Sequence, residues 1–251
     1  MKIHGFQKTT LLDYPGHVAA TVFTGGCNFR CPFCQNGSLV LEPEGQPLIP
    51  EKEVLDHLKK RQGILEGVCI TGGEPTLETD LREFILRCRE LGYLVKLDTN
   101  GYRPEKLGEL LQEGILDYVA MDIKASPENY GRAAGCPGCD VERIRASIRL
   151  LQISGISYEF RTTVVKGIHT VEEFEEIGRL LAGSPVYYLQ AYRDSGDILG
   201  AEHHMQPWKS MPETEGNAVS GRMEPFSKQE MEQMAVLAGK YIDKVVFRGV
   251  E

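Results

Sequence analysis

Short apolar segments alternate with segments of helical periodicity along most of this 251-residue chain. Such an alternation is typical of repeated βα units, in which parallel strands form one sheet and helices cover it. The chain is long enough for one sizeable core, so we expect a single α/β domain. The predicted strands span 18–24, 68–71, 94–98, 118–122, 157–165, 186–191 and 244–247.

Capping patterns mark several of the predicted helix starts. In each of them Ser, Thr or Asp stands three residues before Glu, ahead of an apolar-periodic segment, so that side chains satisfy the first backbone N–H groups. The pairs are Asp80 with Glu83, Thr170 with Glu173, and Ser227 with Glu230.

Polar clusters accompany the predicted strands, mostly at their carboxyl ends. In a parallel barrel these ends meet at one rim, where the connecting loops build the functional site. We therefore expect a single site on this rim. In chain order the clusters are the cysteine-rich loop 27–34, Gly72-Gly73-Glu74, Asp98-Thr99-Asn100-Gly101, Asp122-Ile123-Lys124, Arg161 inside its strand, and Gln190.

The first of these clusters carries Cys27, Cys31 and Cys34 in the spacing C-x3-C-x2-C. Four-iron clusters held wholly by protein use four cysteines, so three thiolates leave one iron open to a substrate. Zinc is the competing metal, but zinc loops pair one C-x2-C with a second such pair or with two histidines, and none follows at a matching spacing. The three cysteines are the predicted metal ligands.

The cysteine spacing, followed by Thr71-Gly-Gly-Glu-Pro75, resembles the radical S-adenosylmethionine (radical SAM) superfamily. The resemblance implies a 4Fe-4S cluster that cleaves S-adenosylmethionine reductively to methionine and a 5'-deoxyadenosyl radical. It also implies that Phe33 meets the adenine edge through its backbone. Gly72, Gly73 and Glu74 would hold the amino group of the methionine moiety.

The same resemblance implies the fold, an α/β partial (β/α)6 barrel with a C-terminal helix and strand extension. One radical SAM domain is expected over 1–251, with its core at about 18–193. An irregular segment at 194–225 contains Trp208 and the pair His203-His204, and its length is typical of a lid, a docking surface or a disordered segment. The C-terminal helix and strand are expected at 226–251.

Several further segments between residues 9 and 193 resemble the glycyl-radical-enzyme activases, and most of all the activating protein of anaerobic ribonucleoside-triphosphate reductase. The resemblance implies a large glycyl-radical enzyme as partner and a low-potential electron donor such as flavodoxin or ferredoxin. The segments are Thr10-Leu-Leu-Asp-Tyr-Pro-Gly16, Gln35-Asn36, Leu97-Asp-Thr-Asn-Gly101, Met121-Asp-Ile-Lys124, Tyr158-Glu-Phe-Arg-Thr-Thr-Val164 and Tyr188-Leu-Gln-Ala-Tyr-Arg193.

The activase resemblance also implies that Asp98 and Asp122 bind a monovalent cation that touches S-adenosylmethionine. Paired carboxylates at one rim suit a hard cation. The alternative is that each aspartate caps the helix after its strand. Asn36 and Asn100 are further predicted cofactor contacts.

Three rim residues complete the predicted cofactor site. Arg161 lies in an apolar and Thr-rich strand, where an unpaired charge is costly, so it needs an anionic partner. The cofactor carboxylate is the implied partner, and an ion pair inside the barrel is the alternative. Lys124 is assigned to the cofactor against a plain surface lysine, and Gln190 to its ribose or adenine against a plain strand-end residue.

The remaining cysteines receive weaker assignments. Cys69 and Cys88 lie in apolar patterns, where cysteine behaves as a small hydrophobe. Cys136-Pro-Gly-Cys139 is consistent with a redox dithiol, half of a metal site, or an inert turn. No catalytic residue is predicted beyond the cluster and the cofactor.

The formal net charge of -8 disfavours nucleic acid and anionic membranes as partners, because both require a basic surface. The N-terminus lacks the apolar region of an export signal, so we expect a cytoplasmic protein. Two alternatives to an activase stay open. One is a radical SAM enzyme that acts on a small molecule, such as a deazapurine synthase, and the other is a non-catalytic iron-sulfur electron carrier.

Overall fold

The computed structural model describes residues 1–200 and 223–249. The chain forms two compact units, of which the first comprises Met1–Asn28, Ser38–Met121 and Arg149–Tyr158. The second comprises Phe29–Gly37, Asp122–Ile148 and Glu159–Glu251. Within the irregular segment expected at 194–225, residues 201–222 lie outside the described part, and His203, His204 and Trp208 lie there too.

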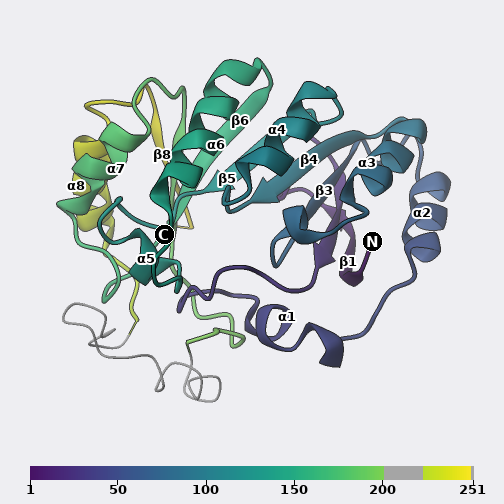
Figure 1. Cartoon of the computed structure of the whole chain (residues 1–251), viewed down its shortest axis with the longest axis horizontal. Coiled ribbons are helices and arrows are strands. Elements are labelled where there is room, and N and C mark those ends of the chain that lie inside the picture. Colours follow the sequence, from purple (N-terminus) through teal and green to yellow (C-terminus); the bar gives the residue numbers. More distant parts are fainter. Residues whose placement is uncertain (201–222, 250–251) are drawn as a thin grey trace. The chain divides into compact units, whose positions relative to one another are not determined.

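The strands of the first unit are hydrogen-bonded in chain order. The first two are antiparallel to each other, and each later strand is parallel to the one before it. They are β1 (Ile3–Thr10), β2 (Ala19–Thr24), β3 (Gly67–Gly72), β4 (Leu94–Thr99) and β5 (Tyr118–Asp122), whose last residue belongs to the second unit. Figure 1 shows this arrangement with helices α2, α3 and α4 packed beside the strands.

Helices of this part of the chain follow the predicted periodicity. The inner face of α3 consists of Leu81, Phe84, Ile85 and Cys88, all fully buried as their spacing predicts. The helices are α1 (Gly37–Leu41), α2 (Glu51–Lys60), α3 (Leu81–Glu90) and α4 (Pro104–Gln112), together with 3-10 turns at Pro43–Gly45 and Pro75–Leu77. Helix α6 (Val141–Ser154) contributes residues to both units.

Strands β6 (Ser157–Val164), β7 (Tyr187–Ala191) and β8 (Val245–Arg248) are parallel to one another and lie mainly in the second unit. This unit also holds the helices α5 (Tyr130–Ala133), α7 (Glu173–Leu180) and α8 (Lys228–Ala238). Helices α7 and α8 lie side by side (Figure 1). A Cβ atom on Gly178 would lie 2.9 Å from the Ala238 Cα, so glycine permits this close approach.

The order of the strands in the sheet is β1 to β8, with the chain-terminal strands β1 and β8 at its two ends. An α/β sheet of this order that does not close on itself confirms the predicted partial barrel with a C-terminal helix and strand. Strand β1 was not predicted from the sequence. Most of its residues, Ile3-His-Gly-Phe-Gln-Lys-Thr-Thr10, are polar and only its two ends are buried, as befits a strand at the edge of a sheet.

The predicted capping hydrogen bonds are confirmed in one case of the three. Ser227 and Glu230 form a reciprocal capping box at the start of α8. Asp80 is the N-cap residue of α3 as predicted, but its side chain makes no capping hydrogen bond, because its carboxylate accepts from the Thr79 hydroxyl and pairs with the N-terminal ammonium. The prediction for Glu173 is wrong. Its carboxylate accepts a 2.7 Å hydrogen bond from the Ser126 backbone N–H, and α7 starts at Glu173 itself.

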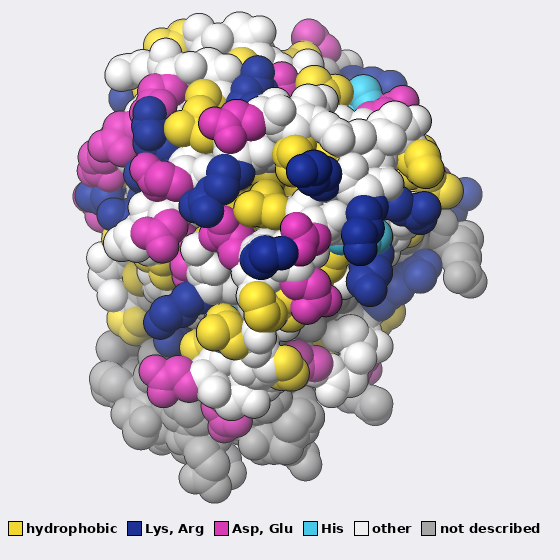
Figure 2. Space-filling model, turned by 90° about the vertical axis from the view of Figure 1, so that its right-hand side faces the viewer, with side chains coloured by type: hydrophobic (Ala, Val, Ile, Leu, Met, Phe, Trp, Pro, Cys, Tyr) yellow, Lys and Arg dark blue, Asp and Glu magenta, His cyan; other side chains and the backbone are white. Residues whose placement is uncertain are grey.

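The face of the first unit that carries α2 mixes both signs of charge (Figure 2). An exposed ion pair joins Lys52 to Asp56 on α2, and a partly exposed one elsewhere in the first unit joins Arg82 to Glu113. Solvent and salt screen surface pairs of this kind, so they tune stability only slightly. Among the described residues, none of the helices has the length and apolar character needed to cross a membrane.

Candidate functional site

The predicted cluster ligands follow β2 directly and divide between the two units, with Cys27 in the first and Cys31 and Cys34 in the second. Cys31 is buried, and the other two are half-buried. A backbone hydrogen bond of 3.0 Å from Cys34 N to Cys31 O closes a tight turn between the later pair. Burial raises the pKa of the Cys34 thiol, and a hydrogen bond with the backbone of Asn36 opposes that rise.

In the second unit, residues 197–200 lie against the cysteine loop. The backbone N–H of Leu199 donates to Cys34 O at 2.9 Å, and that of Gly200 donates to Pro32 O at 2.8 Å. A Cβ on Gly200 would lie 2.6 Å from the Pro32 carbonyl oxygen, so only glycine fits without a shift. The start of the irregular segment is therefore part of the support for the cysteine loop. Sequence reasoning missed this contact.

Phe33 is 5% exposed, and its ring lies 5.9 Å from that of His169. The Val165 backbone N–H donates to His169 Nδ1 at 3.1 Å, and His169 Nε2 lies 2.8 Å from the carbonyl oxygen of Lys124. This pattern requires a neutral ring with its proton on Nε2, and burial lowers the pKa of His169 accordingly. His169 therefore packs beside Phe33, the predicted adenine-binding residue. No sequence motif predicts this contact.

The Gly72-Gly73-Glu74 segment lies against the end of β2 in the first unit. The backbone N–H of Gly73 donates to Thr24 O at 2.9 Å, and that of Glu74 donates to Gly26 O at 2.8 Å. A Cβ on Gly73 would lie 1.8 Å from the Gly26 oxygen. Both glycines are therefore required for the close approach of this loop to the residues that precede Cys27.

The Glu74 carboxylate is 1% exposed and accepts its hydrogen bonds from the chain itself. Oε1 accepts from the hydroxyls of Thr76 at 2.6 Å and Thr99 at 2.7 Å, and Oε2 accepts from the Asn100 backbone N–H at 2.7 Å. Burial raises the pKa of Glu74 despite these donors. Glu74 consequently joins the loop after β3 to the loop after β4, and its predicted contact with the cofactor amino group stays a prediction.

Asn100 is held directly beside the first cysteine. Its Nδ2 donates to Asn28 Oδ1 at 2.8 Å and lies 3.7 Å from Cys27 Sγ, while its Oδ1 accepts from the Tyr102 backbone N–H. A side-chain amide aimed at a thiolate sulfur is one of the means by which proteins tune such a metal centre. This geometry fits the predicted role of Asn100 in the site.

Asp98 does not cap the helix that follows it, because α4 begins at Pro104 with Arg103 at its N-cap. Its carboxylate instead contacts the ammonium group of Lys96, which is 1% exposed. Cys69 Sγ lies 3.7 Å from the same carboxylate oxygen. Cys69 is buried as predicted, but it touches a charged pair and not only apolar groups. Lys96 was not among the predicted site residues.

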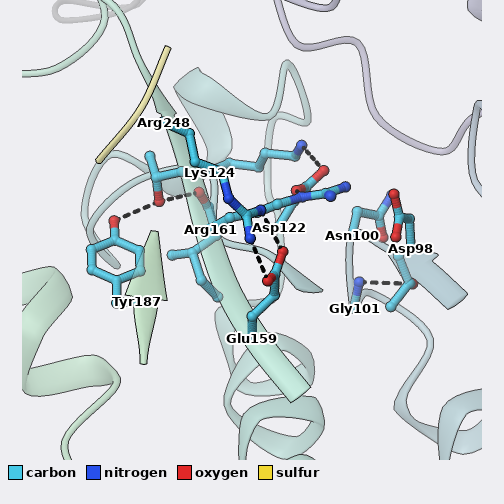
Figure 3. A network of polar contacts seen from close by, with 12 residues as sticks. Asp98, Asn100, Gly101, Asp122, Lys124, Glu159, Arg161, Tyr187 and Arg248 are labelled. Atoms are coloured by element: carbon cyan, nitrogen blue, oxygen red, sulfur yellow. Dashed lines mark hydrogen bonds and ion pairs between the residues drawn. The ribbon is translucent and has the colours of Figure 1, made fainter. Parts of the chain in front are cut away.

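In the second unit, Asp122 receives two protein cations (Figure 3). Arg161 Nε lies 2.5 Å from Oδ1, and Lys124 Nζ lies 3.0 Å from Oδ2. Burial opposes ionisation, but the two positive charges outweigh it and hold the pKa of Asp122 below its usual range. Burial likewise opposes the charged form of Lys124, and Asp122 outweighs it to raise the pKa of the lysine.

These contacts bear on the alternatives stated for this group, and the cofactor contacts of its three residues stay predictions. Asp122 is not a helix cap, since α5 begins at Tyr130 after Asn129. Lys124 is not a surface lysine, because its side chain is 16% exposed. Arg161 forms an ion pair inside the barrel. Arg161 and Lys124 therefore place two cationic side chains on one carboxylate.

A second set of polar contacts, also seen in Figure 3, joins the strands near Asp122, Lys124 and Arg161. Arg248 on β8 makes two hydrogen bonds of 2.7 and 2.8 Å to the buried carboxylate of Glu159 on β6. The Tyr187 hydroxyl donates to Thr162 at 2.6 Å. Gln190, near the end of β7, lies in register with Thr163 and Arg248, which places it on the predicted rim.

Cys136 and Cys139 stand at the two ends of a tight turn that follows α5. The Cys139 backbone N–H donates to Cys136 O at 3.0 Å, and Gly138 has a positive φ of 74°. Pro followed by Gly with positive φ is the sequence of a type II turn.

The described residues contain no convergent group of three or more His, Cys, Asp or Glu side chains in metal-binding geometry.

Residues 21–181 match the family model described as the Radical SAM superfamily. The chain belongs to this superfamily and is a radical SAM enzyme. Over 253 residues it is 29% identical to a Methanocaldococcus jannaschii protein named "Putative glycyl-radical enzyme activating enzyme", covering 99% of this chain and 96% of that protein. It is also 28% identical to a 7-carboxy-7-deazaguanine synthase of Methanopyrus kandleri, over 62% of this chain and 70% of that protein.

Among solved structures, the chain resembles Streptococcus suis SuiB bound to S-adenosylmethionine, with a TM-score of 0.61 and 15% identity. The match covers 90% of this chain and 48% of SuiB, so the chain spans about half the length of that protein. This likeness supports the fold alone.

Membership of the superfamily implies an iron-sulfur cluster and S-adenosylmethionine. The donor set fits them, because three thiols lie within one eight-residue loop and a carboxamide is aimed at one of them.

Proposed function

We propose that this protein is an activase that generates a glycyl radical on a partner enzyme. The observation that carries the proposal is a likeness to a named activating enzyme that runs from end to end of both chains, over 99% of this one and 96% of the other. The deazaguanine synthase matches only 62% of this chain.

The predicted ligands Cys27, Cys31 and Cys34 would hold a 4Fe-4S cluster through three thiolates. When bound, this cluster supplies a low-potential electron that opens the carbon-sulfur bond of S-adenosylmethionine. Within the chain, Asn100 donates toward the Cys27 sulfur, and the cradle of Thr76, Thr99 and Glu74 fixes the loop that carries Asn100.

The second unit supplies the groups suited to the cofactor's charge and ring. Arg161 and Lys124 are cationic side chains held beside Asp122, and we propose, as the family resemblance implies, that Arg161 binds the methionine carboxylate and that Lys124 contacts the cofactor too. Phe33, held by His169, would present its backbone to the adenine, and Asn36 and Gln190 would complete the contacts. Gly72 and Gly73 bring their loop close to the residues that precede Cys27, which leaves the Gly72-Gly73-Glu74 backbone to meet the amino group.

For the partner we propose the anaerobic ribonucleoside-triphosphate reductase, because the motif set resembles the activating protein of that enzyme. A low-potential flavodoxin or ferredoxin would supply the electron. We expect the protein to work in the cytoplasm, where such donors are found.

The proposal is tested by mixing the anaerobically reconstituted and reduced protein with S-adenosylmethionine and the co-encoded reductase. We expect a glycine-centred doublet in the electron paramagnetic resonance spectrum, together with 5'-deoxyadenosine. Cys31→Ala should abolish the absorbance of the cluster and the doublet, because one of three ligands is lost. Cys88→Ala is the matched control, since Cys88 is buried in α3 among apolar residues and should retain both signals.

Two outcomes would contradict the proposal. The ligand assignment fails if Cys31→Ala keeps its 4Fe-4S absorbance. The activase assignment fails if no co-encoded glycyl-radical enzyme acquires a radical while a small molecule drives rapid turnover of S-adenosylmethionine. That result would favour a small-molecule enzyme, as the deazaguanine synthase relative suggests.

A further inference from the structure

A charged side chain lies in the interior of the first unit. Lys96, in the middle of β4, is 1% exposed and stands in register with Cys69 on β3 and Tyr118 on β5. Lysine is almost never fully buried unless it is paired. Lys96 is therefore expected to have a specific electrostatic function.

The partner of Lys96 is Asp98, two residues further along the same strand. Alternation in a strand places both side chains on one face of the sheet, and the ammonium group contacts Asp98 Oδ1. Cys69 Sγ lies 3.7 Å from Lys96 Nζ and 3.7 Å from Asp98 Oδ1, and the Tyr118 ring lies 6.0 Å from the ammonium. Asp98 thus has a positive charge built into the fold beside it.

Asp98 is also one of the two carboxylates that the activase resemblance assigns to a monovalent cation. A cation at this oxygen would have to share it with the Lys96 ammonium, and two like charges in a poorly hydrated interior repel strongly. The other carboxylate, Asp122, already accepts from Arg161 and from Lys124 within the second unit. Neither carboxylate fits a bound alkali ion in this chain.

We infer that the Lys96 ammonium takes the place of an alkali cation at Asp98, so that this enzyme binds and cleaves S-adenosylmethionine without Na+ or K+. Lys96 is a positioning residue: its ammonium group holds the Asp98 carboxylate in place, at the end of the strand that leads into Asn100. The inference rests on the proposed cofactor site, and it does not depend on which partner receives the radical.

The first test uses the anaerobically reconstituted protein without any partner. Its affinity for S-adenosylmethionine, from equilibrium dialysis, and its rate of 5'-deoxyadenosine formation are compared in choline, sodium and potassium chloride at one ionic strength, so that screening stays constant. We expect both quantities to agree within about twofold across the three salts. A larger dependence on Na+ or K+ overturns the inference.

The second test creates the cation requirement. Lys96→Met keeps an unbranched apolar stem and removes the ammonium, which leaves Asp98 with an unoccupied place for a small cation. In choline chloride we expect the affinity for S-adenosylmethionine to fall by more than about tenfold, and K+ or NH4+ to restore most of the loss. Lys60→Met on the exposed end of α2 is the matched control and should show neither effect.

A double variant and a melting experiment complete the test. Lys96→Met with Asp98→Asn removes both charges, so K+ should no longer restore affinity. The melting temperature of Lys96→Met should rise with K+ or NH4+ more than that of the parent, even in the absence of S-adenosylmethionine. A Lys96→Met protein that responds to cations no more than the parent does overturns the inference. Should this variant fail to fold, the salt series on the parent protein decides alone.

These readouts separate the inference from the proposed function. If the parent requires K+ for S-adenosylmethionine binding but still gives a glycyl radical, the inference fails and the activase stands. If no salt supports binding, the proposed cofactor site fails, and the melting temperatures still report whether Lys96 replaces a cation.

Discussion

Glu74 in the first unit and Asp122 in the second are both carboxylates in the predicted cofactor site, but they are held in opposite ways. Glu74 accepts from two hydroxyls and two backbone N–H groups, all of them neutral, and burial raises its pKa. Asp122 accepts from a guanidinium and an ammonium, and its pKa is lowered although burial opposes ionisation.

The difference shows that the two carboxylates have different tasks. Glu74 ties two loops together, and a group held by neutral donors does this over a wide range of salt concentrations. Asp122 balances part of the charge of Arg161 and Lys124 and holds both side chains in place. Of these two carboxylates, Glu74 is therefore held by neutral hydrogen bonds and Asp122 by charge.

The largest expected effect on stability concerns Glu74. Glu74→Ala leaves the hydroxyls of Thr76 and Thr99 and the Asn100 N–H without their acceptor in a buried place, and we expect it to lower the free energy of unfolding by about 3 kcal/mol. Urea denaturation of the reconstituted protein measures this loss. Glu90→Ala, at an exposed position on α3, is the control and should change little. A loss as small as that of the control would mean that the loops do not depend on Glu74.

The second prediction concerns Asp122, where a substitution removes ion pairs and not neutral hydrogen bonds. Asp122→Asn should cost about 2 kcal/mol near neutral pH, less than a fully buried pair, because the Asp122 side chain is 29% exposed. Unlike the loss in Glu74→Ala, this one should shrink in high salt, because salt screens charged groups that are partly exposed. If salt changed the loss of unfolding free energy equally in the two variants, Glu74 and Asp122 would not differ in the way proposed.

The pH dependence of the same carboxylates should have opposite signs. The unfolded chain binds more protons than the folded one at Asp122, whose folded pKa lies below 3.8, so this contribution is present above that pH and is lost on acidification. At Glu74 the folded pKa lies above the ordinary value of 4.5, so the folded chain binds more protons than the unfolded one between these two pKa values. The free energy of unfolding therefore falls as the pH rises from 4.5 through the folded pKa of Glu74. Urea titrations from pH 3 to pH 7 on Asp122→Asn and Glu74→Gln should each remove one of these slopes.

Some parts of the molecule could be predicted from the sequence because the signal is local. Strands such as β3 are runs of apolar and β-branched residues, the apolar face of α3 repeats at helical spacing, and Ser227 with Glu230 is a complete capping box. The motif residues at the strand ends were found for the same reason, since each lies next to a recognisable strand.

The rest depends on contacts between distant residues or on burial that composition hides. His169 supports Phe33 through tertiary packing alone, and residues 197–200 join the cysteine loop through backbone hydrogen bonds that leave no side-chain pattern. The pairing of Lys96 with Asp98 could have been predicted from the sequence, because two side chains that are two residues apart on a strand lie on the same face of the sheet. The two predicted capping hydrogen bonds that do not form involve carboxylates held by a competing partner, the N-terminal ammonium for Asp80 and the Ser126 N–H for Glu173.

A smaller effect is expected at the start of α8. Hydrogen bonds from Ser227 and Lys166 lower the pKa of Glu230 to about 2. The stability that this depressed pKa provides is present above the ordinary pKa of glutamate, and it is lost as the pH falls toward the folded value. Glu230→Gln should therefore melt below the parent at pH 7, and the difference should narrow at low pH. Glu232→Gln, an exposed neighbour in the same helix, should melt with the parent at both values.

The smallest effect is expected at the turn formed by Cys136 and Cys139. The turn is closed by a backbone hydrogen bond and by the positive φ of Gly138, and neither requires sulfur. The double variant Cys136→Ser with Cys139→Ser should therefore cleave S-adenosylmethionine within about twofold of the parent rate, because a C-x2-C loop cannot complete a cluster by itself. Gly138→Ala separates shape from sulfur chemistry: a Cβ there meets no neighbour but is strained at this φ, so it disturbs the turn and keeps both thiols. If the double serine variant loses cleavage with its cluster intact while Gly138→Ala retains it, the two thiols have a redox role.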